Sequence, residues 1–492
     1  MITLRLIILV IYVFSLSFIA IFCMMQLRLL YYYLRYSKGV KSEEIPTIDV
    51  LPFVTIQLPI YNEQLVVNRL IDNIVTLDYP KSLIQIQVID DSTDSTLEIS
   101  RKQVEKYAVK GYDITLHHRT DRSGYKAGAL KAAMPQVKGE FIAIFDADFL
   151  PDADFLRRTL PYFQDSQIGV VQTRWGHLNE DYSFLTKLQA FQLNVHFTVE
   201  QLGRYTADFL LQFNGTAGVW RKETIDSAGG WEADTLTEDL DLSYRAQMKN
   251  WKIKYLEQIE TPAELPSEIQ GFKSQQYRWM KGGAETAKKL LPSVWKSKLP
   301  LRQKIHSTIH LFSSSIFLAI LALSIASVPL LHYINDKSVD PNSFIPFMIS
   351  TTAIIAVYFT ANINIVKREK SILYRTFYFL LLFPAFLSLS MAMAFHNSIA
   401  VLQGYAGKVT AFVRTPKYNI VNKEDKIRKK NQPTSIKFDT KLILELLLAL
   451  LFVAAIIYSI VKGVYALLPM HLALASGYFT LFYLGIKQQL RT

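Results

Sequence analysis

The stretch Phe141-Ile142-Ala143-Ile144-Phe145-Asp146-Ala147-Asp148 decides the fold, because five apolar residues run directly into two carboxylates. The same design stands upstream, where a predicted strand that begins at Ile84 ends with Val88 and Ile89 directly before Asp90 and Asp91. Short β-rich runs alternate here with helical patterns; they cover Phe53–Leu58, Ile84–Asp90, Ile114–His118 and Phe141–Phe145. This alternation predicts an α/β domain with a mainly parallel sheet. Ligands of such sheets bind beyond the carboxyl ends of the strands.

Apolar blocks of helical length flank this region of the 492-residue chain, half of whose residues are hydrophobic. Blocks of this length can cross a hydrocarbon core of roughly 30 Å; they are Leu6–Leu30, Ile309–Leu331, Phe344–Ile365, Leu442–Ile460 and Leu467–Leu484. A cleaved signal peptide is the alternative for the first block, which is however long for one and lacks a small-residue cleavage site. The single cysteine, Cys23, excludes disulfides within one chain.

Basic residues predict the topology of these spans. Only Arg5 precedes the first block, whereas four basic residues follow it: Arg28, Arg35, Lys38 and Lys41. The positive-inside rule then places the amino terminus outside and the α/β domain in the cytoplasm. The net charge is +12, and much of the excess of basic residues lies beside apolar segments. This placement favours anionic lipid headgroups, and not nucleic acid, as the partner.

The apolar stretch Leu373–Leu402 is an exception, because Pro384, His396 and Asn397 interrupt it and the basic stretch Lys408–Lys441 follows. The chain is expected to be cytoplasmic both before and after Leu373–Leu402, so this stretch cannot cross the membrane once. We therefore expect an interfacial helix, with a re-entrant helix or a short hairpin left open. The predicted organisation begins with a transmembrane helix (residues 1–38) and a soluble domain (39–300). A pair of transmembrane helices (301–366), an interfacial helix with a basic loop (367–440) and a final transmembrane pair (441–492) follow.

Carboxylates at the strand ends suggest a cation site. Asp146 and Asp148 offer the oxygen ligands that Mg²⁺ or Mn²⁺ prefers, and such a cation can bridge to phosphates. A solvated turn is the alternative for either acidic motif alone, but the motif recurs in one domain. A third motif is Thr237-Glu238-Asp239, in which Thr237 is the predicted N-cap of a helix. Its carboxylates either serve the helix dipole or supply a general base.

Two further motifs carry groups that suit a phosphorylated sugar. Lys126 follows Gly124 and precedes Gly128 at a predicted helix start, where it is either a phosphate contact or part of a plain surface loop. Gln275, Arg278 and Trp279 share one helix, and they can hydrogen-bond a sugar, pair with a diphosphate and stack on a pyranose ring. A cation–π pair that braces the helix is the alternative for Arg278 and Trp279.

In this order, the motifs resemble glycosyltransferase family 2, whose catalytic domain has the GT-A fold. The resemblance is to its processive branch, the cellulose, chitin, hyaluronan and mannan synthases, and within it to the plant cellulose-synthase-like A and C groups and their bacterial relatives. It spans about Val54–Gly282 and rests also on Gln172–Trp175, His196–Gln201, Phe213–Arg221, Gly229–Trp231 and Glu264–Ser267.

The resemblance implies roles for single residues. Asp90 or Asp91 would contact the nucleotide base or ribose, and Asp239 would deprotonate the acceptor hydroxyl. Asp146 and Asp148 would hold the metal on the diphosphate, with Asp148 favoured as the direct ligand. The acceptor end and the leaving diphosphate would be bound by Glu238, Gln275, Arg278 and Trp279. A one-step displacement would invert an α-linked donor to a β-linked product.

The segment Phe412–Lys417 resembles the Phe-x-Val-Thr-Pro-Lys gating loop of cellulose synthases. Here Arg414 stands where that pattern has Val, and Thr415 and Lys417 match it. A basic juxtamembrane loop on lipid headgroups is the alternative.

The resulting prediction is a multi-pass membrane enzyme of the plasma, inner or Golgi membrane. It would polymerise hexose from UDP-glucose, which is favoured, or GDP-mannose onto a growing glycan; whether a partner extends the export path is left open. Transfer of one sugar to a lipid such as ceramide or polyprenyl phosphate is the alternative. A transporter with a degenerate binding domain is disfavoured, because the set of carboxylates is complete. Sugar stacking and core packing are both open for Trp175, Trp220 and Trp231.

Overall fold

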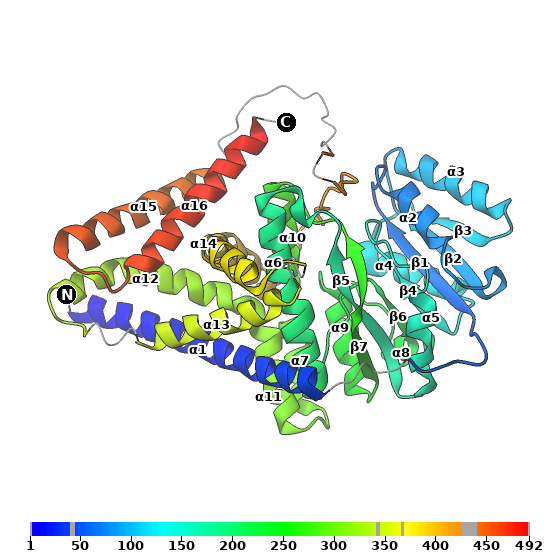
Figure 1. Cartoon of the computed structure of the whole chain (residues 1–492), viewed down its shortest axis with the longest axis horizontal. Helices are drawn as coiled ribbons and strands as arrows, with labels where there is room; N and C mark the ends of the chain where they lie inside the picture. Colours follow the sequence, from blue (N-terminus) through cyan, green and yellow to red (C-terminus); the bar gives the residue numbers. More distant parts are fainter. Residues whose placement is uncertain are drawn as a thin grey trace.

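The computed structural model describes residues 2–39, 45–340, 345–365, 369–422, 424–425 and 440–490. Lys41, one of the basic residues on which the predicted topology depends, lies outside the described residues, as does much of the basic stretch Lys408–Lys441. Figure 1 shows a sheet-containing domain at one end of the molecule and a bundle of long helices at the other.

The domain is built on one seven-stranded sheet with the strand order β3-β2-β1-β4-β6-β5-β7. The pairs β1–β2, β1–β4, β2–β3 and β5–β7 are parallel, whereas β6 runs antiparallel to β4 and β5. The mainly parallel α/β sheet is therefore confirmed. The strands are β1 Val54–Ile60, β2 Ile84–Asp90, β3 Asp113–His118, β4 Phe141–Ile144, β5 Ile168–His177, β6 Gly218–Arg221 and β7 Lys252–Ala263.

Helices cover both faces of the sheet. The apolar core on one face contains side chains from three helices, α2 Val67–Ile74, α3 Thr96–Ala108 and α5 Phe155–Thr159. The core on the other face contains side chains from α4 Tyr125–Ala133, α8 Lys222–Ser227 and α9 Glu238–Met248. Strands covered on both faces read as continuous apolar runs, which is why β4 was recognisable in the sequence.

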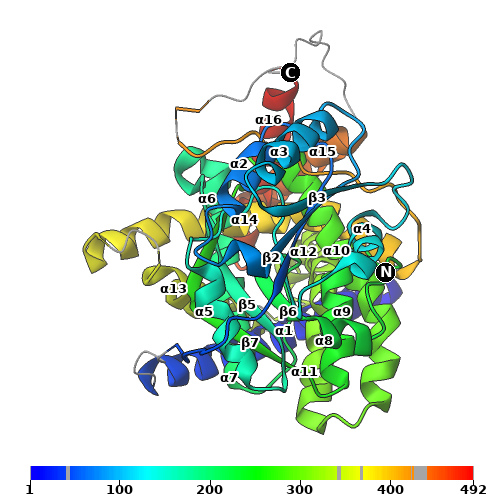
Figure 2. The same cartoon turned by 90° about the vertical axis from the view of Figure 1, so that its right-hand side faces the viewer.

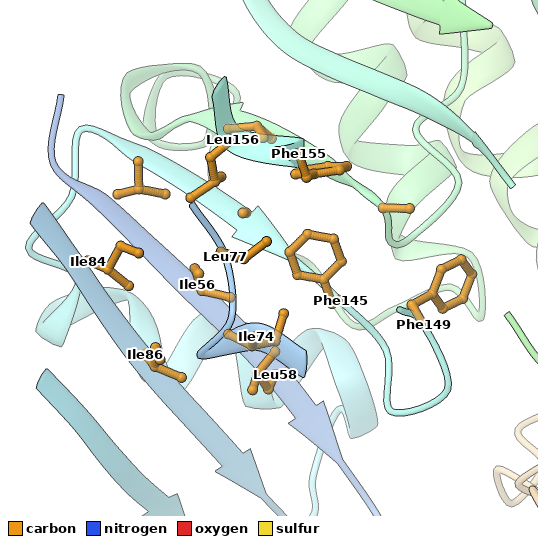
Figure 3. Packing of buried hydrophobic residues seen from close by; sticks show 14 of the residues in the cluster. Ile56, Leu58, Ile74, Leu77, Ile84, Ile86, Phe145, Phe149, Phe155 and Leu156 are labelled. Carbon is orange, nitrogen blue, oxygen red and sulfur yellow. The ribbon is translucent and has the colours of Figure 1, made fainter. Parts of the chain in front are cut away.

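The two faces of β1 and β2 differ in chemistry because successive side chains point to opposite sides. Ile56 and Leu58 pack into the core on the first face (Figure 3). On the second face, Gln57 Nε2 donates a hydrogen bond of 3.0 Å to Gln87 Oε1. This buried bond pairs a donor and an acceptor that would otherwise be costly to bury, and it joins two strands whose ends carry the acidic motifs.

The bundle contains six long helices among the described residues: α1 Ile2–Gly39, α12 Ile316–Asn335, α13 Ile345–Ile363, α14 Ile372–Tyr405, α15 Thr440–Lys462 and α16 Leu468–Gln489. By length and composition, four helical stretches could cross a membrane: Thr3–Tyr36, Leu301–Asn335, Ile372–Tyr405 and Thr440–Lys462. Within α13, Met348–Ile363 is a shorter apolar helix. Helix α16, where a further span is predicted, is not among those four.

Helix α14 runs without a break through Pro384 and covers the whole stretch Leu373–Leu402. The short hairpin, one of the three alternatives for this stretch, is therefore excluded. In Figure 1, α14 is seen nearly end-on while α1 and α12 are seen side-on, so α14 lies across them. The amino terminus and the turn between α15 and α16 lie together at the end of the bundle away from the sheet.

The sheet and the bundle meet through a broken helix, made of α6 Phe184–Val195, a π-helical turn at His196–Glu200 and α7 Gln201–Thr206. Gly203 in α7 allows close packing on α1, because a Cβ at this position would lie 2.6 Å from the carbonyl oxygen of Leu29. Helix α10 Ile269–Lys296 leads from the domain to α11 Leu301–Leu311, which precedes α12. In Figure 2 the domain faces the viewer, with α3 at one end of it and α7 and α11 at the other.

Candidate active site

A cavity of about 660 Å³ lies between the carboxyl ends of the strands and the helix bundle. Almost every residue that the sequence singles out lines it: Asp91, Lys126, Asp146, Asp148, Glu238, Asp239, Gln275, Arg278, Trp279, Arg414, Thr415 and Lys417. Segments up to about 300 residues apart in the chain thus share one space. The cavity continues between α1, α12, α13 and α14, where Phe22, Phe317, Ile354 and Phe386 line it.

The two carboxylates at the end of β2 have different environments. Asp90 is fully buried and accepts hydrogen bonds from Ser100 Oγ at 2.6 Å and from the backbone N–H of Ser92 at 2.7 Å. These bonds fasten the strand to α3, and Asp90 does not line the cavity. Asp91 does line it, and the Arg119 guanidinium donates to both of its oxygens, from Nε at 2.9 Å and from Nη2.

The carboxylates that follow β4 each pair with a lysine. Lys126 Nζ contacts Asp146 and donates to the carbonyl oxygen of Gly215 at 2.8 Å. Lys417 Nζ lies 2.6 Å from Asp148 Oδ2. Burial raises the pKa of the Asp146 carboxyl, and the charge of Lys126 opposes that rise. Two neighbouring carboxylates that attract cationic groups form a donor set of hard oxygen ligands, which fits Mg²⁺ or Mn²⁺.

Glu238 and Asp239 form the first turn of α9 and face the same cavity. Thr237 stands at the N-cap position, but its side chain makes no capping hydrogen bond. Its hydroxyl instead shares a 2.9 Å hydrogen bond with the Thr286 hydroxyl of α10. Gly282 of α10 makes this approach possible, because a Cβ there would lie 2.6 Å from the methyl group of Thr237. Thr237 therefore stands at the predicted N-cap position, but its side chain ties α9 to α10 instead of capping the helix.

The environment of Asp239 suits a general base. Burial, and next the charge of the neighbouring Glu238, raise the pKa of Asp239 to about 7. Burial also raises the pKa of Glu238, while Lys126 opposes the rise. For Lys126, burial lowers the pKa but Asp146 and Glu238 outweigh it, so the pKa lies above its usual value. A base is most effective when its pKa lies near the working pH.

Gln275, Arg278 and Trp279 lie at i, i+3 and i+4 on α10, so they share one face of the helix. Arg278 Nη1 donates to the carbonyl oxygen of Val413 at 2.5 Å, and Nη2 donates to Thr415 Oγ1 at 2.9 Å. Burial lowers the pKa of Arg278 to about 10, which keeps the guanidinium charged at neutral pH.

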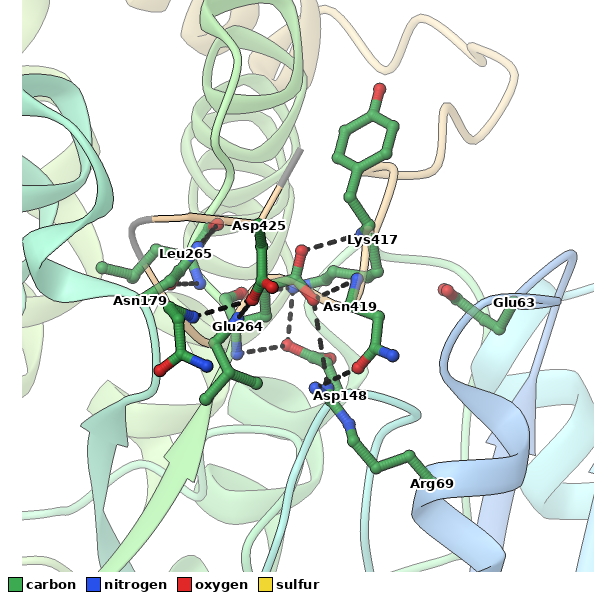
Figure 4. Close-up of polar contacts among 12 residues, drawn as sticks. Glu63, Arg69, Asp148, Asn179, Glu264, Leu265, Lys417, Asn419 and Asp425 are labelled. Carbon is green, nitrogen blue, oxygen red and sulfur yellow. Dashed lines mark hydrogen bonds and ion pairs between the residues drawn. The ribbon is translucent and has the colours of Figure 1, made fainter. Parts of the chain in front are cut away.

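Residues 408–422, which we call the covering segment, cross the mouth of the cavity after α14. Lys417 and the two residues after it are held by Glu264, as Figure 4 shows. Glu264 accepts hydrogen bonds from the backbone N–H groups of Tyr418 at 2.8 Å and Asn419 at 2.9 Å, and its carbonyl oxygen accepts one from Lys417 Nζ at 2.7 Å. Arg69 Nη2 lies 3.9 Å from the same carboxylate.

Arg414 joins the covering segment to the loop after β1. Its Nη1 donates to the carbonyl oxygen of Tyr61 at 3.4 Å, and its Nη2 lies 3.6 Å from Glu63 Oε2. Burial raises the pKa of Glu63 to about 8, and Arg414 opposes that rise. Neither Glu63 nor Glu264 was assigned a role from the sequence. Glu264 lies in a segment that carries the family resemblance, which was the available signal.

The tryptophans divide between the cavity and the core. Trp220 and Trp231 are buried in the core beside α8 and α9, with ring centroids 5.8 Å apart. Trp175 and Trp279 line the cavity. Of the three tryptophans for which stacking on a sugar was left open, only Trp175 is placed where a ligand could reach it.

The sheet order and the carboxylates after β4 define a GT-A domain, in agreement with a solved structure of the same fold. That structure is the mannosyltransferase PcManGT from Pyrobaculum calidifontis in complex with GDP-Man and Mn²⁺. It superimposes on this chain with a TM-score of 0.54 at 21% sequence identity. The superposition covers 80% of this chain and 100% of the PcManGT chain.

Residues 52–282 match the family model described as glycosyltransferase like family 2. Glucomannan 4-beta-mannosyltransferase 1 of Oryza sativa subsp. japonica is 42% identical over 270 residues, which are 54% of this chain and 52% of that protein. Glucomannan 4-beta-mannosyltransferase 9 of Arabidopsis thaliana is 42% identical over 262 residues, 52% of this chain and 49% of that protein. The chain spans about half the length of the curated relatives it matches. Its residues 52–282 are a domain of glycosyltransferase family 2.

Proposed function

We propose that this chain is a membrane-bound inverting hexosyltransferase that extends a β-linked glycan and uses GDP-mannose as its donor. The observation that carries the proposal is the single cavity in which Asp146, Asp148, Asp239 and Arg278 converge from three separate motifs. The names of the relatives support mannose. They weigh against UDP-glucose, which the sequence alone slightly favoured.

The donor would lie along the ends of β2 and β4. Asp91 would contact the nucleoside, and Lys126 would contact the diphosphate. A bound Mg²⁺ or Mn²⁺ would be held by Asp146 and Asp148, where it would neutralise diphosphate charge as a Lewis acid. Lys417, which now pairs with Asp148, is available to contact the same phosphate oxygens.

The acceptor would approach from the side of α10. Its hydroxyl loses the proton to a carboxylate oxygen of Asp239, and the resulting oxygen nucleophile attacks the anomeric carbon of the donor. The bond from that carbon to the diphosphate oxygen breaks, and its electron pair leaves with the nucleoside diphosphate. Arg278 stabilises the developing negative charge. Attack opposite to the leaving group converts an α-linked donor to a β-linked product.

We further propose that the cavity between α1, α12, α13 and α14 receives the growing glycan. The domain would face the cytoplasm, as the basic residues Arg28, Arg35 and Lys38 in the last part of α1 favour, and α14 would lie at the interface. The end-on view of α14 in Figure 1 supports this orientation. The covering segment would lie on the cytoplasmic side above the donor.

Transfer of one sugar to a lipid is the second candidate, and one observation favours it. The part of the cavity between the helices is lined largely by apolar side chains, such as Phe22, Phe317, Ile320, Leu323 and Phe386. Such a wall suits an isoprenoid or acyl chain as well as the apolar faces of pyranose rings.

The test is transfer by the full chain in membranes or detergent, with labelled GDP-mannose and labelled UDP-glucose compared in Mn²⁺ and in Mg²⁺. We expect label from GDP-mannose in a product that endo-β-mannanase degrades. Glu105→Gln, an exposed position on α3, is the matched control and should not change the yield. Label only in a solvent-extractable lipid would support the second candidate. No transfer from either donor would contradict both candidates.

A further inference from the structure

A second polar network lines the same cavity where α1 meets the broken helix of α6 and α7. It is centred on Glu200 at the end of the π-helical turn between α6 and α7. Glu200 accepts hydrogen bonds from Gln26 Nε2 of α1 at 2.7 Å and from Arg204 Nη2 at 3.2 Å, and His196 Nδ1 lies 3.1 Å from the carboxylate. π-helical turns are rare and frequently occur at functional sites.

The network reaches to within one residue of the proposed base. His196 Nε2 lies 2.8 Å from Asn214 Oδ1. The next residue, Gly215, accepts a hydrogen bond from Lys126, and a Cβ at Gly215 would lie 3.1 Å from Asp239 Oδ2. The network therefore adjoins the reacting groups, and an acceptor whose end lies at Asp239 can extend toward Asn214.

The network has unused hydrogen-bonding capacity. Among the described residues, Asn214 Nδ2 and Arg204 Nε and Nη1 are buried without a hydrogen-bond partner, as are both ring nitrogens of His306, which also lines the cavity. Asn214, Arg204 and His306 are 7%, 4% and 3% exposed. The side chains of His196 and Glu200 are 26% and 19% exposed, so a ligand in the cavity can reach them. Buried polar groups are nearly always paired, which indicates that a ligand or water completes this set.

The chemistry of the set selects the ligand. Burial opposes ionisation of Glu200, but Arg204 and the hydrogen bonds from His196 and Gln26 hold its pKa well below the usual range. An ionised carboxylate would repel a phosphate, and it accepts hydrogen bonds only. Asn214 and Arg204 offer donors beside it. A polyhydroxyl ligand matches such a mixture, because each hydroxyl both donates and accepts.

We propose that Glu200, His196 and Asn214 form an acceptor subsite, which binds hydroxyl groups of a sugar unit behind the reacting end of the acceptor glycan. This inference rests on the proposed function, since it assumes that the acceptor is a glycan. It adds three binding residues to which the sequence assigned no role, two in the π-helical turn and one in the loop before β6. It also links this network to the first helix of the bundle through Gln26.

The test measures binding without turnover. Fluorescently labelled β-1,4-linked mannose oligosaccharides of one to five units are titrated onto the purified full chain, and Kd is plotted against length. Glu200→Gln keeps the shape of the side chain and removes its charge. Asn214→Ala is the second variant, because it leaves the pair between Glu200 and Arg204 intact. Glu98→Gln, which lies on the surface of α3 and pairs with Arg101, is the matched control.

We expect the wild type to bind longer oligosaccharides more tightly than mannose, and both site variants to lose about tenfold of that gain, as fits the loss of a hydrogen bond to a charged group. Binding of the single sugar and of GDP-mannose should not change, which also reports that the variants fold. Unchanged length dependence in both variants, or none in the wild type, would overturn the subsite. If the length dependence is lost as expected but GDP-mannose supports no transfer, the subsite stands and the donor assignment fails.

Discussion

The two halves of the cavity differ in what lines them. The half at the sheet is lined by charged groups, among them Asp146, Asp148, Glu238, Asp239, Lys126 and Arg278. In the other half, the described lining residues of α12, α13 and α14 include no charged side chain; apolar and aromatic residues predominate, with a few hydroxyl groups. In the first half, buried charged groups of opposite sign pair with one another. The second half offers a ligand mainly an apolar surface of defined shape.

This difference indicates which substitutions should lower transfer activity most. Removing one partner from a buried set of charges leaves the other partners uncompensated, and the reacting groups lose their protonation states as well. Substituting an apolar residue that lines the bundle half alters only how the ligand fits the cavity. The expected effects therefore fall from the sheet half to the bundle half.

The largest effect is expected for Asp239→Asn, because the amide has nearly the same shape but accepts no proton. Transfer from GDP-mannose should fall by about 10³-fold, within the usual range for a general base. Affinity for GDP-mannose, measured by titration, should be unchanged. Transfer at the wild-type rate would remove Asp239 from the mechanism.

A smaller loss is expected for Asp148→Ala, which removes one of two proposed metal ligands. Transfer should fall by roughly 10²-fold at fixed Mn²⁺, since a metal supplies several kcal/mol of charge stabilisation. The half-maximal Mn²⁺ concentration should rise. If the rate falls while the Mn²⁺ dependence stays that of the wild type, Asp148 is not a ligand.

Arg278→Lys should cost about tenfold to 100-fold in kcat. Lysine keeps the charge but cannot reproduce the two directed bonds to Val413 and Thr415 of the covering segment. Arg278→Ala should cost more than Arg278→Lys. Equal losses in the two variants would show that the charge of Arg278 contributes nothing.

The smallest effect on chemistry is expected in the bundle. Phe386→Ala should change the rate of the first transfer by less than about threefold, because it removes no group that touches reacting atoms. The length of the product, measured by gel filtration, should change. A 10²-fold loss in the rate of first transfer would break the distinction between the two halves.

Much of the sheet half could be predicted from the sequence, because its signals are local. An apolar strand that runs into Asp146 and Asp148 is legible in a window of eight residues. The strand β2 has its predicted bounds, Ile84–Asp90.

What could not be predicted depends on contacts between distant segments. The hydroxyl of Thr237 is drawn to Thr286, so the capping role suggested by its position is lost. Asp90 and Asp91 are equivalent in sequence, but only the fold places one in the core and one on the cavity. The network around Glu200 joins α1, the π-helical turn and Asn214, which share no local pattern.

The central claim is that Asp239, with a pKa near 7, is the base of a sugar transfer. The most direct measurement is the pH dependence of single-turnover transfer from saturating GDP-mannose between about pH 5 and 9. Because the base must be ionised, we expect the rate to fall about tenfold for each pH unit below a midpoint near 7. Glu238→Gln removes a charge that raises this pKa, so the midpoint should move to lower pH. A flat profile, or a midpoint that Glu238→Gln leaves in place, would contradict the account.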